Sequence, residues 1–302
     1  MPSRSATGLR ETSDHVNSRV SGYLAVDIGG TKLAAGIVAP DGELLSSAQV
    51  PTPRVGVWDA LAVLIDEQMQ GSTIEVSACG VGCGGPMEPD GELVSTLHIA
   101  EWRNFPLRES LAKHTRLPTF VANDAQAIVL GEHWVGALQG ERNAIGMVVS
   151  TGVGGGVISD SRLVRGRLGN AGHIGHVIVE PDGRLCACGA RGCLEAHASG
   201  TAIRDLTGRP AKDADIEVRR QTGRYVGRAL ASVGALFDLR RAVVGGSVAL
   251  GFGAPFFEGV SEELDLRCGL DFIRGFVVTP VALGPSCPLI GAAAVARAAT
   301  IV

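Results

Sequence analysis

The sequence predicts an α/β fold built from two lobes, and three observations favour it. The chain has 302 residues, of which 45% are hydrophobic, enough for a large core divided between two lobes. A strand, a glycine-rich turn and a second strand occur near residue 23 and again near residue 144, so the two hairpins are counterparts in the two halves. Helical and strand-like segments alternate after each hairpin, which is typical of α/β proteins.

The first half opens with the segments Tyr23–Asp27 and Leu33–Val38, two strands joined by the turn Gly29-Gly30-Thr31-Lys32. Apolar spacing and turn residues then define the later elements of this half. These are a strand near 44–50 after Asp41-Gly42, a helix at Val57–Gln70, a strand at Val76–Val81 that runs into Gly84 and Gly85, a short helix at Leu107–Lys113, a strand at Pro118–Ala122 and a helix at Ala125–Leu138.

The second half opens with a strand at Ala144–Ser150, a glycine-rich turn at Thr151–Gly156 and a returning strand at Val157–Asp160. The remaining expected elements are a helix at 221–237, a strand at 241–245 that ends at Gly245-Gly246, a helix near 254–264, a strand at 276–282 and a final helix at 288–299.

Composition excludes several classes of function. The net charge is −4 and the pI is about 6.0, so no basic groove for nucleic acid is expected. The apolar runs near 143–158 and 242–257 are broken by glycines and are too short to span a membrane. Residues 1–21 are polar and lack the apolar core of a secretory signal, so we interpret them as a disordered extension. The odd number of cysteines, seven, argues against a secreted disulfide scaffold and favours a cytoplasmic protein.

The two glycine-rich turns indicate a site for anionic oxygens. Backbone N–H groups at Gly29 and Gly30 are free of side chains and would bind phosphate, with a point charge from Lys32 and a hydroxyl from Thr31. An ordinary hairpin turn is the alternative for either segment alone, and neither matches a P-loop or a dinucleotide-binding fingerprint. The corresponding residues of the second turn are Thr151, Gly152, Gly154 and Gly155.

Acidic residues end two of the predicted strands, and each has two interpretations. Asp27 would either form an Asx-type turn or hold hydrated Mg²⁺ close to the phosphates. Asn123 and Asp124 lie where a strand gives way to a helix, so either would cap the helix. In the functional interpretation, Asn123 orients a sugar and Asp124 is the general base that takes a proton from its hydroxyl.

A histidine and three cysteines form the pattern H-x9-C-x-C-x4-C, at His176, Cys186, Cys188 and Cys193. Three thiolates and one imidazole close a tetrahedral zinc shell with no open position, which is typical of a structural site. Turn and core thiols, with His176 as a buried histidine, are the alternative. Glu195 follows two residues after the last cysteine, and it is either directed by the zinc loop or favoured by the start of a helix.

These motifs together resemble the ROK family of repressors, open reading frames and kinases, from about residue 22 to the end. The segments that carry the resemblance are D-I-G-G-T-K at 27–32, G-V-G-C-G-G-P at 80–86, E-W-R-N-F-P-L at 101–107, N-D at 123–124, S-T-G-V-G-G-G at 150–156, G-N-A-G-H-I-G-H at 169–176, C-A-C-G-A-R-G-C-L-E at 186–195 and V-V-G-G at 243–246.

The resemblance implies an actin-like (ribonuclease H-like) fold of two α/β domains around a central cleft. The smaller domain would comprise residues 22–123 with 288–302, and the larger one, with the zinc loop, residues 124–287. It implies ATP held by both hairpins and beside Gly245 and Gly246, with Mg²⁺ near Asp27, and Asp124 as the catalytic base. The sugar site would consist of Gly84, Gly85, Asn123, Asp124, His173, His176 and Glu195.

Two departures from the family pattern bear on the substrate, and a third, a short segment, bears on a surface lobe or the oligomer contact. His173 stands where family kinases usually have a glutamate that contacts sugar hydroxyls, and a neutral imidazole offers one acceptor and one donor where a carboxylate accepts twice. His98-Ile99-Ala100-Glu101-Trp102 replaces the usual N-L-x-x-W, and the segment between Ser199 and the helix expected at 221 is short. We therefore expect the sugar to be glucose, another hexose or an N-acylated amino sugar.

The resemblance favours an ATP-dependent kinase that phosphorylates the 6-hydroxyl of this sugar and acts as a homodimer. A sugar-binding or regulatory protein with little catalysis is the alternative, motivated by His173. The regulators of the family carry a DNA-binding winged helix before the first strand, and only about twenty polar residues precede that strand here.

Overall fold

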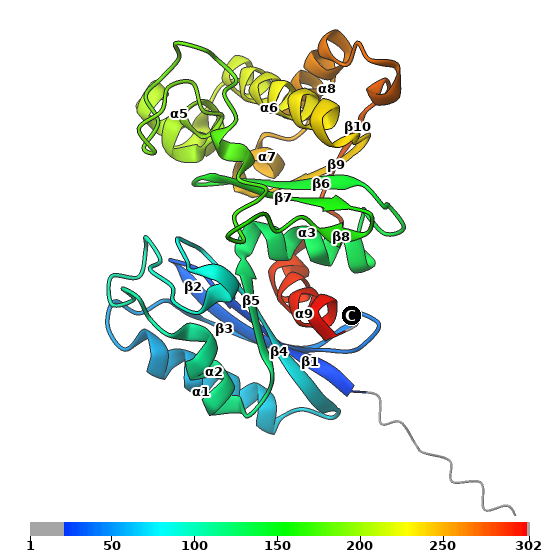
Figure 1. The fold of residues 1–302 in the computed structure, drawn as a ribbon. Helices are drawn as coiled ribbons and strands as arrows, with labels where there is room; N and C mark the ends of the chain where they lie inside the picture. The colour runs from blue at the N-terminus through cyan, green and yellow to red at the C-terminus, as the bar shows by residue number, and fades with distance from the viewer. Residues whose placement is uncertain (1–20, 301–302) are drawn as a thin grey trace, which may run out of the picture.

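The computed structural model describes residues 21–300, so the predicted disordered extension lies almost entirely outside the described residues. Two five-stranded mixed sheets are stacked with two helices between them (Figure 1). The first sheet has the order β3-β2-β1-β4-β5 and the second the order β10-β9-β6-β7-β8. In each sheet an antiparallel hairpin extends a set of three parallel strands, so the two halves repeat one topology, as the paired hairpins of the sequence predict.

The position of each strand in the first sheet explains which of its residues are buried. β1 lies in the middle of the sheet, and five consecutive residues, Gly22–Val26, are buried because helices cover both faces. β3 is the edge strand, and its residues alternate between partly buried and exposed, the pattern of a strand with one face toward solvent. The strands of this sheet are β1 (Ser21–Ile28), β2 (Lys32–Val38), β3 (Leu44–Pro51), β4 (Glu75–Cys83) and β5 (Thr119–Asn123).

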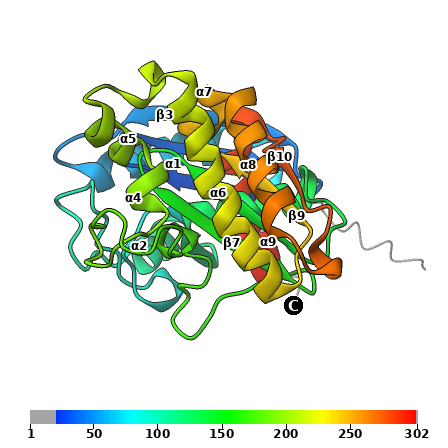
Figure 2. The ribbon, with the colours of Figure 1, turned by 90° about the horizontal axis from the view of Figure 1, so that it is seen from above.

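Helices fill the layers on either side of the sheets. The outer face of the first sheet is covered by α1 (Val57–Gln70) and α2 (Leu107–Thr115). Between the sheets lie α3 (Asp124–Val135) and α9 (Cys287–Thr300). On the outer face of the second sheet, α6 and α8 pack side by side, as Figure 2 shows from above. The helices of this outer layer are α4 (Glu195–Ala198), α5 (Gly200–Thr207), α6 (Ile216–Phe237), α7 (Ser247–Phe252) and α8 (Ala254–Arg267).

The second sheet departs from the sequence prediction at its hairpin. Its second strand begins at Val153, and the predicted start at Val157 is wrong because Gly154–Gly156 are strand residues paired with β6. Helix α3 crosses this strand closely enough that a Cβ on Gly154 would lie 2.8 Å from the Cβ of Ala125. The strands of this sheet are β6 (Ala144–Val149), β7 (Val153–Ser159), β8 (Arg162–Leu163), β9 (Arg241–Gly245) and β10 (Val277–Pro280).

Several helix ends differ from the sequence prediction, most of all the start of α6. Helix α6 begins at Ile216 rather than at 221, because Asp215 caps it by accepting the N–H of Val218 at 2.9 Å. Helix α3 ends at Val135 rather than at Leu138, and its C-cap is Gly136. The predicted domain boundaries stay predictions, since the helices that begin there, α3 and α9, both lie between the two sheets. Within residues 21–300 no helix is long and apolar enough to cross a membrane.

The two central helices cross at a contact between glycines. A Cβ on Gly131 of α3 would lie 2.9 Å from the Cα of Gly291 of α9, and a Cβ on Gly291 would lie 2.5 Å from the carbonyl oxygen of Ala127. Around this crossing, apolar side chains of both helices, among them Val129 and Val295, form one core with strands of the second sheet. The crossing therefore brings two helix backbones into direct contact between the sheets.

We expect Gly291→Ala to lower the free energy of unfolding by about 1–3 kcal/mol, because the added methyl group meets helix backbone that cannot rotate away. Urea denaturation would measure the change. Gly251→Ala in α7 is the matched control, since a Cβ there meets nothing within 4 Å and alanine is the better helix former. Equal stabilities for the two variants would contradict the tight crossing.

Candidate active site

Three parallel strands of the first sheet end at the same edge, and two of them, β1 and β5, have an acidic residue there. The register pairs Asp27 of β1 with Gly82 of β4, and Cys83 of β4 with Asn123 of β5. A Cβ on Gly82 would lie 3.8 Å from both the Oδ1 atom of Asp27 and the Cα of Asp124. The glycine between the two acidic residues leaves them facing the same space, as expected for a ligand site at the carboxyl ends of parallel strands.

A cavity of about 1020 Å³ opens at this edge and is lined from both sheets. Most of the residues that the sequence predicts for the site contribute to its wall. These are Asp27, Gly29, Gly30, Thr31, Lys32, Gly84, Gly85, Asn123, Asp124, Thr151, Gly152, Gly154, His173, His176 and Glu195.

Three predicted nucleotide-binding residues do not line this cavity. Gly155 lies within β7, where a Cβ would meet the carbonyl oxygen of Gly146 at 2.7 Å and the side chain of Ile174 at 3.0 Å. Gly245 is the last residue of β9, and Gly246, which precedes α7, packs against the backbone of Val149. Residues 150–154 of the second hairpin therefore line the cavity, whereas Gly155, Gly245 and Gly246 do not.

Burial changes the acidity of both carboxylates. It raises the pKa of Asp27 from 3.8 to about 6, and nearby Asp124 adds to the shift while Lys32 opposes it. Burial also raises the pKa of Asp124, although hydrogen bonding from the Ala125 N–H and the proximity of His173 oppose that rise. Two acidic groups with raised pKa values in one cavity are a common feature of catalytic sites.

The first glycine turn is held from outside the hairpin. The Thr52 hydroxyl donates to the carbonyl oxygen of Gly29 at 2.7 Å, and the Thr52 N–H donates to that of Thr31 at 3.1 Å. Among the hydrogen bonds of residues 21–300, none involves the Asp27 carboxylate, so the Asx-turn interpretation of Asp27 is wrong. Its carboxylate instead faces the cavity.

Asn123 caps helix α3, and both Asn123 and Asp124 line the cavity. The Oδ1 atom of Asn123 accepts the N–H of Ala125 at 3.1 Å, which confirms the cap at the start of α3. Asp124 Oδ1 accepts the same N–H at 2.8 Å. Both residues also line the cavity, so capping the helix and facing a ligand are compatible here.

The second hairpin is joined to the segment that follows the cysteines. Glu195 Oε2 accepts the N–H of Val153 at 2.9 Å, and the Thr201 hydroxyl donates to the carbonyl oxygen of Thr151 at 3.1 Å. Glu195 is also the first residue of α4, as the helix-start interpretation requires. It therefore connects the hairpin turn, the start of α4 and the cavity.

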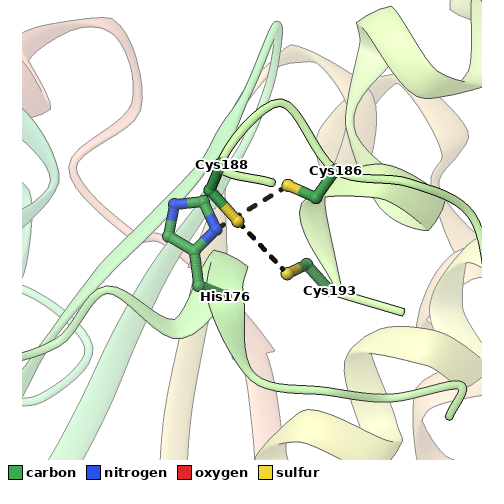
Figure 3. Close-up of side chains that lie close together, drawn as sticks. All are labelled: His176, Cys186, Cys188 and Cys193. Carbon is green, nitrogen blue, oxygen red and sulfur yellow. Dashed lines mark hydrogen bonds between the residues drawn. The ribbon is translucent and has the colours of Figure 1, made fainter. Parts of the chain in front are cut away.

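The predicted metal ligands come together (Figure 3). One ligand atom from each of His176, Cys186, Cys188 and Cys193 lies within 4.8 Å of the others. The Sγ atoms of Cys188 and Cys193 are 3.7 Å apart, and Cys186 Sγ is 3.8 Å from His176 Nδ1. Two sulfurs at about 2.3 Å from one tetrahedral ion would be about 3.8 Å apart, so the distances fit a single four-coordinate metal.

Sequence reasoning missed several residues of the cavity wall. Thr96 comes from the loop before α2, Gln126 from the first turn of α3, Asp90 from the 3₁₀ turn Pro89–Gly91 and Arg165 from the loop after β8. His98, which the sequence analysis relates to the substrate, also lines the cavity. Arg165 Nη1 lies 3.0 Å from Asp90 Oδ1, so this ion pair joins the two halves at the cavity. Gln126 was detectable as a single amide within the apolar helical segment A-Q-A-I-V-L.

Comparison with known proteins identifies the family. The family model described as ROK family matches residues 23–299. The chain belongs to the ROK family. The ROK motifs of the sequence are spread over the same range, and most of them lie on the cavity wall or in the metal-ligand cluster.

ROK relatives match along nearly the whole chain. Glucokinase from Streptomyces coelicolor is 33% identical, covering 91% of this chain and 97% of its own. N-acetylmannosamine kinase from Escherichia coli is 36% identical, covering 76% and 84%. The crystal structure of a ROK family glucokinase from Streptomyces griseus, in complex with glucose and AMPPNP, is 32% identical with a TM-score of 0.76, covering 92% and 99%. The predicted actin-like α/β fold is confirmed.

We expect Asp27 to contribute a component of the unfolding free energy of the metal-free protein that falls as pH rises from about 4 to about 6. Folded Asp27 keeps a proton in this range that the unfolded chain has released, so ionisation costs up to about 3 kcal/mol of unfolding free energy. Asp27→Asn should remove this component, and urea denaturation across pH 4 to 7.5 would measure it. Asp213 is exposed, so the control variant Asp213→Asn should show the wild-type dependence of unfolding free energy on pH. If Asp27→Asn also shows the wild-type dependence, the argument that burial raises the pKa of Asp27 is contradicted.

Proposed function

We propose that this ROK protein is an ATP-dependent sugar kinase that transfers a phosphoryl group to the 6-hydroxyl of a hexose or an N-acylated amino sugar. The observation that carries the proposal is the position of Asp124, a solvent-accessible carboxylate at the start of α3 on a cavity that both glycine hairpins line. The names of the relatives support it, since they include a glucokinase, an N-acetylmannosamine kinase and a glucokinase complex with glucose and AMPPNP.

Asp124 is the general base of this reaction. Its carboxylate takes the proton of the sugar hydroxyl, the hydroxyl oxygen forms a bond to the γ-phosphorus, and the bond to the bridging oxygen breaks to release ADP. The raised pKa of Asp124 suits a group that accepts a proton near neutral pH. Asn123 uses its side-chain oxygen to cap α3, which leaves its NH₂ group to donate to a sugar hydroxyl.

The glycine hairpins hold the nucleotide phosphates. Gly30 exposes backbone near the Lys32 ammonium, and Gly152 does so on the opposite side of the cavity. The expected role of the Gly29 N–H is wrong, because this group donates to the carbonyl oxygen of Lys32 at 3.0 Å within the turn. Asp27 would hold hydrated Mg²⁺, which supplies neutralising charge to the phosphates when it is bound. The positions of these groups on two different sheets support a phosphate chain that lies between the halves.

His173 is the residue most relevant to the choice of sugar. It is exposed on the cavity wall, and its ring centroid lies 6.2 Å from that of His176. A neutral imidazole pairs with one donor and one acceptor, whereas the family's usual glutamate accepts from two hydroxyls. This difference supports a substrate whose hydroxyl pattern, or N-acyl group, differs from what a glutamate binds best.

A coupled assay of ADP release over a panel of hexoses and N-acylated amino sugars would test the proposal. We expect turnover on at least one sugar, and we expect Asp124→Asn to lower kcat by at least about 100-fold, because the base is lost while the shape is kept. Sugar affinity, measured by calorimetry, should change little. Sugar binding without turnover on any sugar would favour the alternative, a catalytically weak sugar-binding protein, and an Asp124→Asn variant with full kcat would exclude Asp124 as the base.

We further propose that His176, Cys186, Cys188 and Cys193 hold a structural Zn²⁺. The soft donor set, the four-coordinate distances and the short spacing of the cysteines support zinc. His176 would bind the ion through Nδ1 and keep its other ring nitrogen for the cavity that it also lines. The chain continues from Cys193 through one residue to Glu195, so the cluster would orient two cavity residues at once.

We expect metal analysis to find about one zinc per chain. Cys188→Ser should lose most of this zinc and raise the KM for sugar about tenfold, since 10–100-fold effects are usual when support for site residues is removed. Cys268→Ser changes a buried thiol outside the cluster and should keep the zinc. Protein purified without chelators that contains no zinc would overturn the assignment, whatever its activity.

The sequence also predicts a cytoplasmic location and a homodimer. None of the seven cysteines, all of which the structure describes, forms a disulfide, which suits the reducing cytoplasm. The homodimer is supported by the family resemblance alone. Both therefore stay predictions beside the proposed activity.

A further inference from the structure

A buried amide joins the start of α3 to a distant loop. Gln126 lies two residues after Asp124, and its side chain is buried, with 6% of the residue exposed. Its Nε2 atom donates to the carbonyl oxygen of Gly169 at 3.1 Å and to that of Ala171 at 2.9 Å. Both hydrogens of one NH₂ group are thus accounted for by two carbonyls that are 43 and 45 residues away along the chain.

The loop that receives these bonds leads directly to His173. It closes on itself, because the N–H of Ala171 donates to the carbonyl oxygen of Arg165 at 3.1 Å. Gly172 has a φ of +95°, and a Cβ there would lie 2.7 Å from the carbonyl oxygen of Gly155, so the loop turns sharply against β7. Residues 165–172, here called the sugar loop, therefore determine where His173 enters the cavity.

The sugar loop has a weaker connection on its other side. Arg165 pairs with Asp90 of the first half at 3.0 Å, but the two side chains are 58% and 62% exposed. An exposed ion pair is screened by water and salt, whereas a buried amide whose partners are removed leaves polar groups unsatisfied. Gln126 is therefore the stronger of these two side-chain attachments.

We propose that Gln126 is a positioning residue that sets the distance between the catalytic helix and the sugar-binding His173. The inference rests on the proposed kinase function. Asp124 does not depend on Gln126, since its own hydrogen bond comes from the N–H of Ala125. Loss of the amide should therefore displace the sugar loop and leave the base and the first glycine hairpin in place.

The kinetic test is Gln126→Leu, which removes both hydrogen bonds. We expect the KM for sugar to rise about 10- to 100-fold, as the loss of two buried hydrogen bonds implies, with the KM for ATP within about twofold of wild type. Gln126→Glu keeps the size but turns a carboxylate toward two carbonyls, so its effect should be at least as large. Gln126→Asn keeps an amide of shorter reach and should lie between wild type and Gln126→Leu.

Gln68→Leu is the matched control. Gln68 lies in α1, its Oε1 atom accepts from the Ser46 hydroxyl at 2.9 Å, and it does not line the cavity. Both KM values should stay at wild-type levels in this variant. If the KM for sugar and the KM for ATP rise together in the Gln126 variants, the role of Gln126 is merely structural and the proposal is overturned.

Hydrogen exchange and sugar binding separate this inference from the kinase proposal. In Gln126→Leu, or in Gln126→Asn should the leucine variant not fold, amides 169–176 should exchange about tenfold faster while those of β6 stay unchanged. Equilibrium affinity for sugar should fall in parallel. If the wild-type protein shows no turnover, only the kinase proposal is contradicted. If hydrogen exchange of the loop and sugar affinity are unchanged in the Gln126 variants, the positioning role of Gln126 is overturned.

Discussion

The contact between Gly131 and Gly291 determines how the two halves of the molecule meet. Because no side chain separates α3 from α9 there, the helices cross backbone to backbone between the sheets. A fully buried carboxylate reinforces the crossing, since Glu132 accepts N–H groups from Ala282 and Leu283, just before α9. The separation of the two sheets, and hence the width of the cavity between them, follows from this packing.

The same helix that makes the crossing begins at Asn123 and Asp124, the residues proposed to orient the sugar and to act as the base. Asn123 and Asp124 are held at the N-terminus of α3 by hydrogen bonds to Ala125, so their positions are fixed by the helix rather than by a loop. The positive end of the helix dipole favours a carboxylate, yet burial still raises the pKa of Asp124. The packing that fixes the helix therefore also creates the desolvated environment that makes this carboxylate basic.

Local patterns predicted most of the site, and long-range packing explains what they missed. Asp27 and Asn123-Asp124 were identifiable because strand ends and helix starts have local signatures. Gly154–Gly156 were interpreted as a turn because glycine has the same local signature in a turn and in a strand that a helix crosses closely. Gln126 could not be paired with Gly169 from the sequence, since neither residue type indicates a partner 43 residues away.

Non-local attachments of this kind recur where loops enter the cavity. The first hairpin turn is held by Thr52, the loop before His173 by Gln126, and the second hairpin by Glu195. Glu195 itself comes from a segment with little regular structure, because α4 has four residues and only isolated bridges precede it. The core residues Leu194 and Ala198 anchor this segment, and the proposed metal ligand Cys193 lies two residues before Glu195.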